Sequence, residues 1–216
     1  MTPEIINNFN TSTYCLEQGY KSMIKIGAND GVTDEKFLAF MTITKDLKAV
    51  FVEPLGYMLE RAKEKYKSHK NIVYKNVAIA EEKGELPFYY LGPKLYEAHP
   101  DAPKFCAMLG SFNPTHIWSE LRGRYSDFIV IEKVPTDTLM AVIEEVDLFD
   151  VDILQIDTEG FDYKILRQLD LEKCRPKLIF FEYKHLSPQE KVQALELLSP
   201  LYRISALEQD YVCFLK

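Results

Sequence analysis

The amino-acid sequence predicts an α/β protein with a mostly parallel sheet, helices on both faces of the sheet and an antiparallel hairpin at the C-terminus. Short apolar runs alternate with amphipathic segments, the runs are apolar almost throughout, and two runs close the chain around a short polar turn. Near-continuous apolar strands are typical of parallel sheets that are covered on both faces.

The apolar runs give the strands in order. The first run, SMIKI, is short and rich in apolar residues and stops at Gly27, as strands often do. Five strands are expected at residues 22–26, 49–52, 72–74, 152–156 and 178–181, and the hairpin strands at residues 202–205 and 211–215.

Helix signals stand between these runs. Thr33, Asp34 and Glu35 supply an N-cap and acids for a first helical turn. Ser187 and Glu190 form a capping box with Pro188 at the first helical position. This capping box is expected to open a helix that runs to Leu198, and another helix is expected at residues 162–169. Three further helices are expected where apolar residues recur at helical spacing: Phe37, Leu38 and Met41; Leu55, Met58, Leu59, Ala62 and Tyr66; and Leu139, Val142, Ile143 and Val146.

One segment breaks the alternation. Residues 79–135 are too long for a crossover and too rich in turn residues for one helix, so we expect an insertion there. Its ends, residues 85–90 and 128–134, resemble strands that can pair with each other. With no linker or repeat in sight, residues 1–216 are expected to form a single domain.

Composition narrows the class of protein. The 216 residues include 33 acids against 26 Lys and Arg, a net charge of −7, which argues against a nucleic-acid partner. There is no membrane-length apolar run and no leader-like N-terminus, so we expect a cytoplasmic protein without a membrane partner. The four cysteines are far apart, without metal-ligand or disulfide-framework spacing.

The loop after the first strand reads IGANDG, and it favours one kind of cofactor. Gly27 and Gly31 allow a ligand to approach the backbone closely. A dinucleotide fingerprint would need glycines where Asn29 and Val32 stand, and Asp30 would repel a pyrophosphate. S-adenosylmethionine, which lacks phosphates and has a cationic end, therefore suits this loop better than NAD or ATP. A tight turn without a ligand is the alternative.

The next two strand ends can complete a nucleoside site. Glu53 ends the second strand, where a carboxylate can accept hydrogen bonds from both ribose hydroxyls. Asn76, Val77 and Ala78 follow the third strand and can contact an adenine. A solvated strand-end charge and an ordinary turn are the alternatives for these two segments.

Titratable side chains follow the fourth and fifth strands. Methyl transfer to a hydroxyl needs removal of a proton, for which the candidates are Asp157, Glu159, Glu182 and His185. Carboxylates at the ends of apolar strands are costly to desolvate and need partners or a purpose. Helix capping is the alternative role. No spacing among these residues demands a metal ion, and no metal site is predicted.

These motifs together resemble the FkbM family of S-adenosylmethionine-dependent methyltransferases. The resemblance covers about residues 22–185 and is carried by IKIGANDG (24–31), VFVEP (50–54), YKNVAIAEEKGELPFY (74–89), VPTDTL (134–139), DILQIDTEGFDYKIL (152–166) and KLIFFEY (177–183).

The resemblance implies a Rossmann-like class I methyltransferase fold with a seven-stranded sheet, and commonly methylation of a hydroxyl group. It also implies that Gly27, Asn29, Gly31 and Glu53 line the cofactor, with Asp157 near the methionine end. The family usually has an acid two residues before the first glycine, whereas this chain has Lys25, and Asp30 is expected to compensate as a further cofactor-binding residue.

The insertion is expected to recognise the methyl acceptor. Its aromatic and cationic side chains suit a sugar or an anionic or phenolic molecule, and the candidates are Tyr96, His99, Phe112, His116, Trp118, Arg122 and Arg124. A small satellite core with a solvated Arg face is the alternative.

The resulting hypothesis is an S-adenosylmethionine-dependent methyltransferase acting on an oxygen of a small-molecule or carbohydrate acceptor. Two alternatives stay open: an NAD-dependent oxidoreductase on a similar sheet, and a degenerate methyltransferase fold that serves as a binding or scaffold subunit. Lys25 motivates the second alternative.

Overall fold

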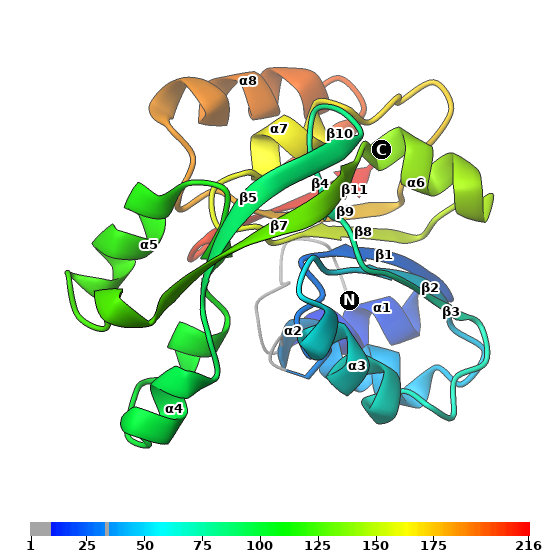
Figure 1. Cartoon of the computed structure of the whole chain (residues 1–216). Coiled ribbons are helices and arrows are strands. Elements are labelled where there is room, and N and C mark those ends of the chain that lie inside the picture. Colours follow the sequence, from blue (N-terminus) through cyan, green and yellow to red (C-terminus); the bar gives the residue numbers. More distant parts are fainter. Residues whose placement is uncertain (1–9, 33–34) are drawn as a thin grey trace.

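A computed structural model describes residues 10–32 and 35–216 of the protein. Their main sheet has seven strands in the order β10-β11-β9-β8-β1-β2-β3 (Figure 1). All neighbours pair in parallel except β9 with β11 and β10 with β11, which confirms the predicted parallel sheet with a terminal hairpin. The strands are β1 Ser22–Ile26, β2 Lys48–Val52, β3 Ile72–Lys75, β8 Ile153–Ile156, β9 Leu178–Glu182, β10 Tyr202–Leu207 and β11 Asp210–Leu215.

Helices cover both faces of this sheet (Figure 1). One face carries α1 Thr11–Glu17, α2 Glu35–Ile43 and α3 Gly56–Lys65, and the other carries α6 Leu139–Val146, α7 Asp162–Leu166 and α8 Pro188–Leu198. Alternate side chains of β1 pack on opposite faces of the sheet: Met23 lies in the core on the α2 side and Ile24 in the core on the α6 side. Both faces of each central strand are therefore buried, which explains the continuous apolar runs.

The helix boundaries follow local signals. The capping box at the start of α8 is present, since the Ser187 side chain accepts from the Glu190 N–H and the Glu190 carboxylate accepts from the Ser187 N–H. The helix predicted at residues 162–169 ends earlier, at Leu166, because the N–H groups of Gln168 and Leu169 bond three residues back instead of four. Helix α1 has no predicted counterpart, and the predicted N-cap at Thr33 and Asp34 lies outside the described residues.

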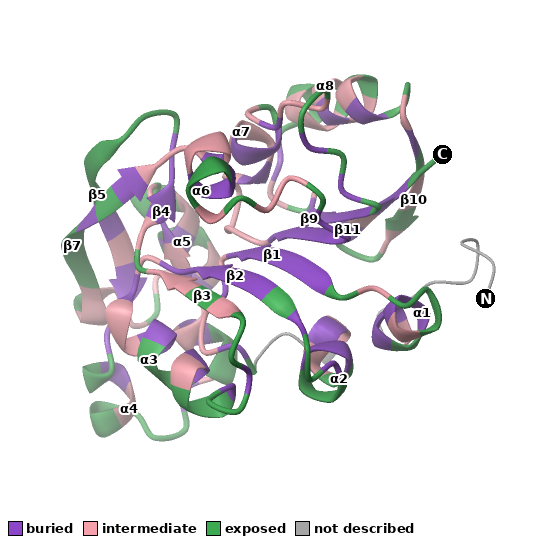
Figure 2. Ribbon diagram, turned by 90° about the vertical axis from the view of Figure 1, so that its right-hand side faces the viewer, coloured by how far each residue is buried: buried purple, intermediate pink, exposed green. Residues whose placement is uncertain are grey.

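The insertion forms a second sheet of order β4-β7-β5-β6. Its strands are β4 Ala78–Ile79, β5 Gly84–Leu91, β6 Gly110–Ser111 and β7 Ile129–Asp137. Strands β5 and β7 pair antiparallel from Gly84 opposite Thr136 to Leu91 opposite Ile129, which confirms the predicted pairing of the insertion's ends. In Figure 2 the main sheet is largely buried, whereas β5 and β7 have exposed stretches.

Short helices connect β5 to β7: α4 Lys94–Ala98, a 3-10 turn at Lys104–Ala107 and α5 Pro114–Leu121. They pack on a small apolar cluster of their own that includes Leu95, Cys106 and Ile117. A separate cluster joins Phe88 and Val134 of the second sheet to Leu55 and Met58 beside the main sheet. The insertion is thereby held over the carboxyl ends of the main strands. Within residues 10–32 and 35–216, no helix has the length and apolarity needed to cross a membrane.

Candidate active site

A cavity of about 610 Å³ lies at the carboxyl ends of β1, β2 and β8. Gly27 and Glu53 line it from the main sheet, and Phe88 and Phe112 line it from the insertion. Ligands of open α/β sheets bind in such crevices beyond the strand ends, and the volume falls within the range of small-molecule sites. The insertion therefore closes over the place where the main sheet is expected to bind its ligand.

The glycine loop is fixed between the two neighbouring strands. The N–H groups of Gly27 and Ala28 both donate to the Val52 carbonyl at the end of β2, at 3.0 Å. Gly27 has φ +76°, and a Cβ added there would lie 1.9 Å from the Asp157 carbonyl oxygen. Only glycine fits this close approach between the ends of β1 and β8.

Glu53 is buried at the centre of the site. One carboxylate oxygen accepts from the Asn29 N–H at 2.8 Å, and the other accepts from the Leu55 N–H at 2.9 Å. Burial raises the pKa of Glu53 to about 7, although both hydrogen bonds and Lys25 oppose the rise. The carboxylate is therefore oriented by backbone donors, and each oxygen keeps a lone pair for a ligand hydroxyl.

The predicted cofactor residues divide into two groups. Gly27, Asn29, Glu53, Val77, Ala78 and Asp157 line the cavity. Asp30, Gly31 and Asn76 stabilise its frame instead. The Asp30 carboxylate accepts from the Val32 N–H, the Gly31 carbonyl accepts from the Tyr66 hydroxyl, and the Asn76 amide donates to the carbonyls of Glu53 and Pro54.

Two lysines line the same cavity. Lys25, at the position where the family usually has an acid, is 1% exposed and donates to the side chain of Gln155, its register partner on β8, at 2.7 Å. Lys36 forms an ion pair with Asp210 at 2.5 Å. No pattern in the sequence singled out Lys36, because its partner is 174 residues away along the chain.

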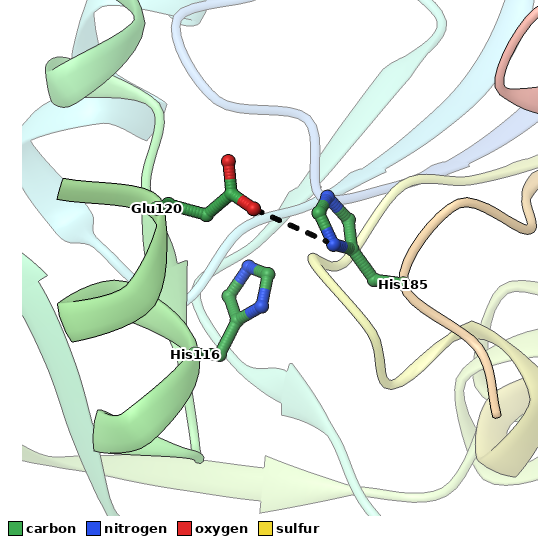
Figure 3. A group of neighbouring side chains, drawn as sticks. All are labelled: His116, Glu120 and His185. Atoms are coloured by element: carbon green, nitrogen blue, oxygen red, sulfur yellow. Dashed lines mark ion pairs between the residues drawn. The ribbon is translucent and has the colours of Figure 1, made fainter. Parts of the chain in front are cut away.

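Past the ends of β8 and β9, five side chains form what we call the acid–imidazole cluster: His116, Glu120, Glu159, Glu182 and His185. A Glu159 carboxylate oxygen, Oε2, lies 3.0 Å from His116 Nε2 and 3.5 Å from His185 Nε2. Glu182 Oε1 lies 3.6 Å from His185 Nε2. Figure 3 shows His116 and Glu120 projecting from α5 toward His185. Of the five, Glu159 also lines the cavity.

The backbone at Glu159 is strained. Its φ is +54°, in the left-handed region that costs a residue with a side chain of order 1 kcal/mol. Gly160 follows with φ +96°. This turn directs the Glu159 carboxylate toward both imidazoles, so the strain accompanies the geometry that brings the cluster together.

Negative charge is concentrated around this cluster. Asp162 is fully buried and accepts from the Thr158 hydroxyl and the Glu182 N–H, which ties the end of β8 to the end of β9. Burial, followed by the charge of Asp157, raises the pKa of Asp162 to about 7. Burial and three neighbouring carboxylates raise the pKa of Glu182 to about 9, and burial lowers the pKa of His185 although Glu159 opposes this.

The predicted acceptor residues do not gather at one place. Phe112 lines the cavity, and His116 lies in the acid–imidazole cluster. Tyr96 is half-buried within the insertion, where its hydroxyl donates to the Pro103 carbonyl, whereas His99 is exposed and its ring lies tilted against that of Tyr125. Trp118, Arg122 and Arg124 are exposed and are not among the residues that line the cavity. The insertion's aromatic residues thus include a satellite core as well as a wall of the site.

Sequence reasoning missed Glu120 and Asp162 as members of this region. Glu120 lies one helical turn after His116, and Asn113 followed by Pro114 is a signal for a helix start that would have placed both on one face. The Asn113 side chain does accept from the Thr115 N–H at 3.0 Å. Asp162 had no signal beyond its place at the start of a predicted helix.

Comparison with known proteins identifies the family. Residues 25–213 match the methyltransferase FkbM domain. No curated protein is significantly similar to the chain in sequence.

Among solved structures, the O-methyltransferase from Bacillus cereus in complex with SAH matches with a TM-score of 0.53 and 11% identity over 100% of this chain and 82% of that one. A methyltransferase from Geobacter sulfurreducens matches with a TM-score of 0.51 and 9% identity over 98% and 80% of the two chains. These likenesses establish the class I methyltransferase fold, and the family match covers most of the sequence. The chain therefore belongs to the FkbM family of S-adenosylmethionine-dependent methyltransferases.

Proposed function

We propose that the protein transfers a methyl group from S-adenosylmethionine to a hydroxyl oxygen of a small-molecule or carbohydrate acceptor. The observation that carries this proposal is the His116–Glu159 pair, whose carboxylate lines the same cavity as Glu53. A neutral hydroxyl is a weak nucleophile and needs a base within reach of its proton. Membership of the FkbM family removes the oxidoreductase alternative.

The cavity fits the cofactor at its nucleoside end. Glu53 offers two oriented oxygens to the ribose hydroxyls, as its contacts with the Asn29 and Leu55 N–H groups leave lone pairs on both. Leu55, Val77 and Ala78 provide apolar surface for an adenine. This combination of one buried carboxylate with apolar walls suits a neutral nucleoside without phosphates.

The amino-acid end of the cofactor needs both signs of charge. Asp157 lines the cavity and suits an ammonium group, while Lys25 and Lys36 line it and suit a carboxylate. The Lys25 ammonium is held by Gln155 in the position where the family usually has an acid. We propose that these lysines take over recognition of the carboxylate end, so that Lys25 does not disable the site.

When bound, S-adenosylmethionine would supply a methyl group on a sulfonium, whose S–C bond would break with its electron pair left on sulfur as the acceptor oxygen formed the O–C bond. The hydroxyl proton passes to the His116–Glu159 pair. Glu159 orients the imidazole through the 3.0 Å contact and stabilises it once it carries the proton. The apolar side chains of Phe88, Phe112 and Phe161 exclude water and offer flat surfaces to a sugar or phenol ring.

The first test is calorimetric titration with S-adenosylmethionine and S-adenosylhomocysteine, with NADH as the control. Saturable binding of the first two compounds, but not NADH, is expected. The protein is then incubated with labelled cofactor and a panel of sugars and phenols, and the product linkage is determined by NMR. An N-linked product would contradict the oxygen assignment. Folded protein that binds neither compound would favour the scaffold alternative.

A further inference from the structure

The acid–imidazole cluster contains three atoms with the spacing of metal ligands. Glu159, Glu182 and His185 each offer one ligand atom, and these three atoms lie within 4.8 Å of one another. His185 Nε2 lies 3.5 Å from the Glu159 oxygen and 3.6 Å from the Glu182 oxygen. Metal–ligand bonds of about 2.0–2.2 Å place tetrahedral ligands about 3.3–3.6 Å apart. Both distances from His185 Nε2 already have this spacing, so rotation of the two carboxylates would let all three side chains contact one ion.

A second observation points to a cation at the same place. The other oxygen of Glu182, Oε2, is buried and has no hydrogen-bond partner among the described residues. Its side chain is only 10% exposed, and its backbone is anchored by the N–H bond to Asp162. A buried carboxylate oxygen without a donor costs free energy of folding, and a cation bound beside it offsets that cost.

We propose that Glu159, Glu182 and His185 bind one divalent transition-metal ion. The cluster offers a second set of three, His116, Glu120 and His185, which Figure 3 displays. That set is the weaker candidate because Lys184 Nζ lies 3.7 Å from Glu120 Oε2 and already supplies a positive charge there. The set with Glu182 contains the unpartnered oxygen and the greater concentration of carboxylates.

The ligand types determine which ions bind best. Two carboxylates and one imidazole suit Mn²⁺ or Zn²⁺, whereas Mg²⁺ and Ca²⁺ prefer sites made only of oxygen. Three protein ligands also leave coordination positions open. Since Glu159 lines the cavity, the ion would lie at the cavity wall, within reach of an acceptor oxygen. This role in the reaction rests on the proposed function, but binding of the ion does not.

The test is calorimetric titration of chelator-treated protein with Mn²⁺, Zn²⁺ and Mg²⁺, paired with thermal unfolding. Wild type is expected to bind one Mn²⁺ or Zn²⁺ per chain, more tightly than Mg²⁺, and to unfold at a higher temperature with the metal. Glu182→Gln and His185→Ala should each weaken binding at least tenfold. Glu120→Gln, and Glu196→Gln on the exposed face of α8, should bind like wild type.

Folding of the variants has its own readout. Glu182→Gln keeps the size and shape of the buried side chain, so without metal it should unfold at about the same temperature as wild type, while losing the rise that metal produces. Three results would overturn the proposal: no saturable binding by wild type, unchanged binding by Glu182→Gln, or loss of binding in Glu120→Gln with retention in Glu182→Gln. S-adenosylmethionine titrated into the same metal-free protein tests the proposed function separately.

Discussion

The two ends of the cavity treat their carboxylates differently. At the end of β2, backbone N–H groups donate to both oxygens of Glu53, and the nearby charges of Lys25 and Asp30 act on its pKa in opposite directions. At the ends of β8 and β9, Glu182 is surrounded by the carboxylates of Asp157, Glu159 and Asp162, and one of its oxygens has no donor among the described residues. The first end is built to orient a neutral polyhydroxyl group. The second end holds uncompensated negative charge, which a proton or a cation must offset.

The largest expected effect comes from breaking the second end alone. Glu159→Gln keeps the shape of the side chain but removes the charge that pairs with His116, so the methyl-transfer rate should fall by about a hundred-fold to ten-thousand-fold. The affinity for S-adenosylmethionine should change little. The rate is measured with an acceptor identified from the panel of sugars and phenols, and the affinity is measured by calorimetry. Glu196→Gln, which makes the same change of charge on the exposed face of α8, is the control. A rate equal to wild type would rule out a role for the His116–Glu159 pair.

Gly27→Ala should destabilise both parts of the site, because Gly27 lies between the end of β2, to which its N–H donates, and the end of β8 at Asp157. The added Cβ would meet the Asp157 carbonyl oxygen at 1.9 Å and would have to push β1 and β8 apart. We expect the free energy of unfolding to fall by about 2–4 kcal/mol in denaturant titrations. Gly19→Ala is the control, since Gly19 also has positive φ, +68°, but a Cβ there meets nothing within 4 Å. Equal losses in the two variants would mean that backbone strain, and not the clash, sets the cost.

Removing the Glu53 carboxylate should weaken binding of S-adenosylmethionine without affecting the acid–imidazole cluster. Glu53→Ala removes the acceptor of the ribose hydroxyls, which is worth about 1.5–3 kcal/mol for charge-assisted hydrogen bonds, or tenfold or more in affinity. Calorimetry with S-adenosylmethionine measures this loss. Metal binding by the same variant should match wild type. Unchanged cofactor affinity would contradict the assignment of Glu53.

The smallest expected effect is a dependence of nucleoside affinity on pH, which reports on Glu53 alone and so separates it from the carboxylates at the ends of β8 and β9. With its pKa raised to about 7, Glu53 is mostly protonated at pH 6 and mostly charged at pH 8. Only the charged form accepts from both ribose hydroxyls, so affinity should rise with pH by about tenfold across this interval. Adenosine is the probe, since it has no group of its own that titrates there. Glu53→Gln should bind adenosine with the same affinity at both values, and a slope that persists in that variant would assign the effect to another group.

The sequence was most informative where contacts are local or repetitive. The apolar runs predicted the strands of the main sheet, and the capping box predicted the start of α8. Gly27 and Glu53 could be placed at strand ends because parallel strands bring their carboxyl ends to one edge. These features follow from periodicity and backbone stereochemistry, which neighbouring residues determine.

Only the tertiary structure decided which polar groups meet. His116 comes from the insertion and Glu159 from the end of β8, 43 residues apart, and packing of α5 brings them to 3.0 Å. Of the predicted acceptor residues, Phe112 reaches the cavity, whereas Trp118 faces solvent. Periodicity gives the buried face of a helix or strand, but the meeting of side chains from distant segments depends on how those segments pack. The motifs of the sequence therefore determined the fold and the cofactor, while three-dimensional packing decided the arrangement of the reactive groups.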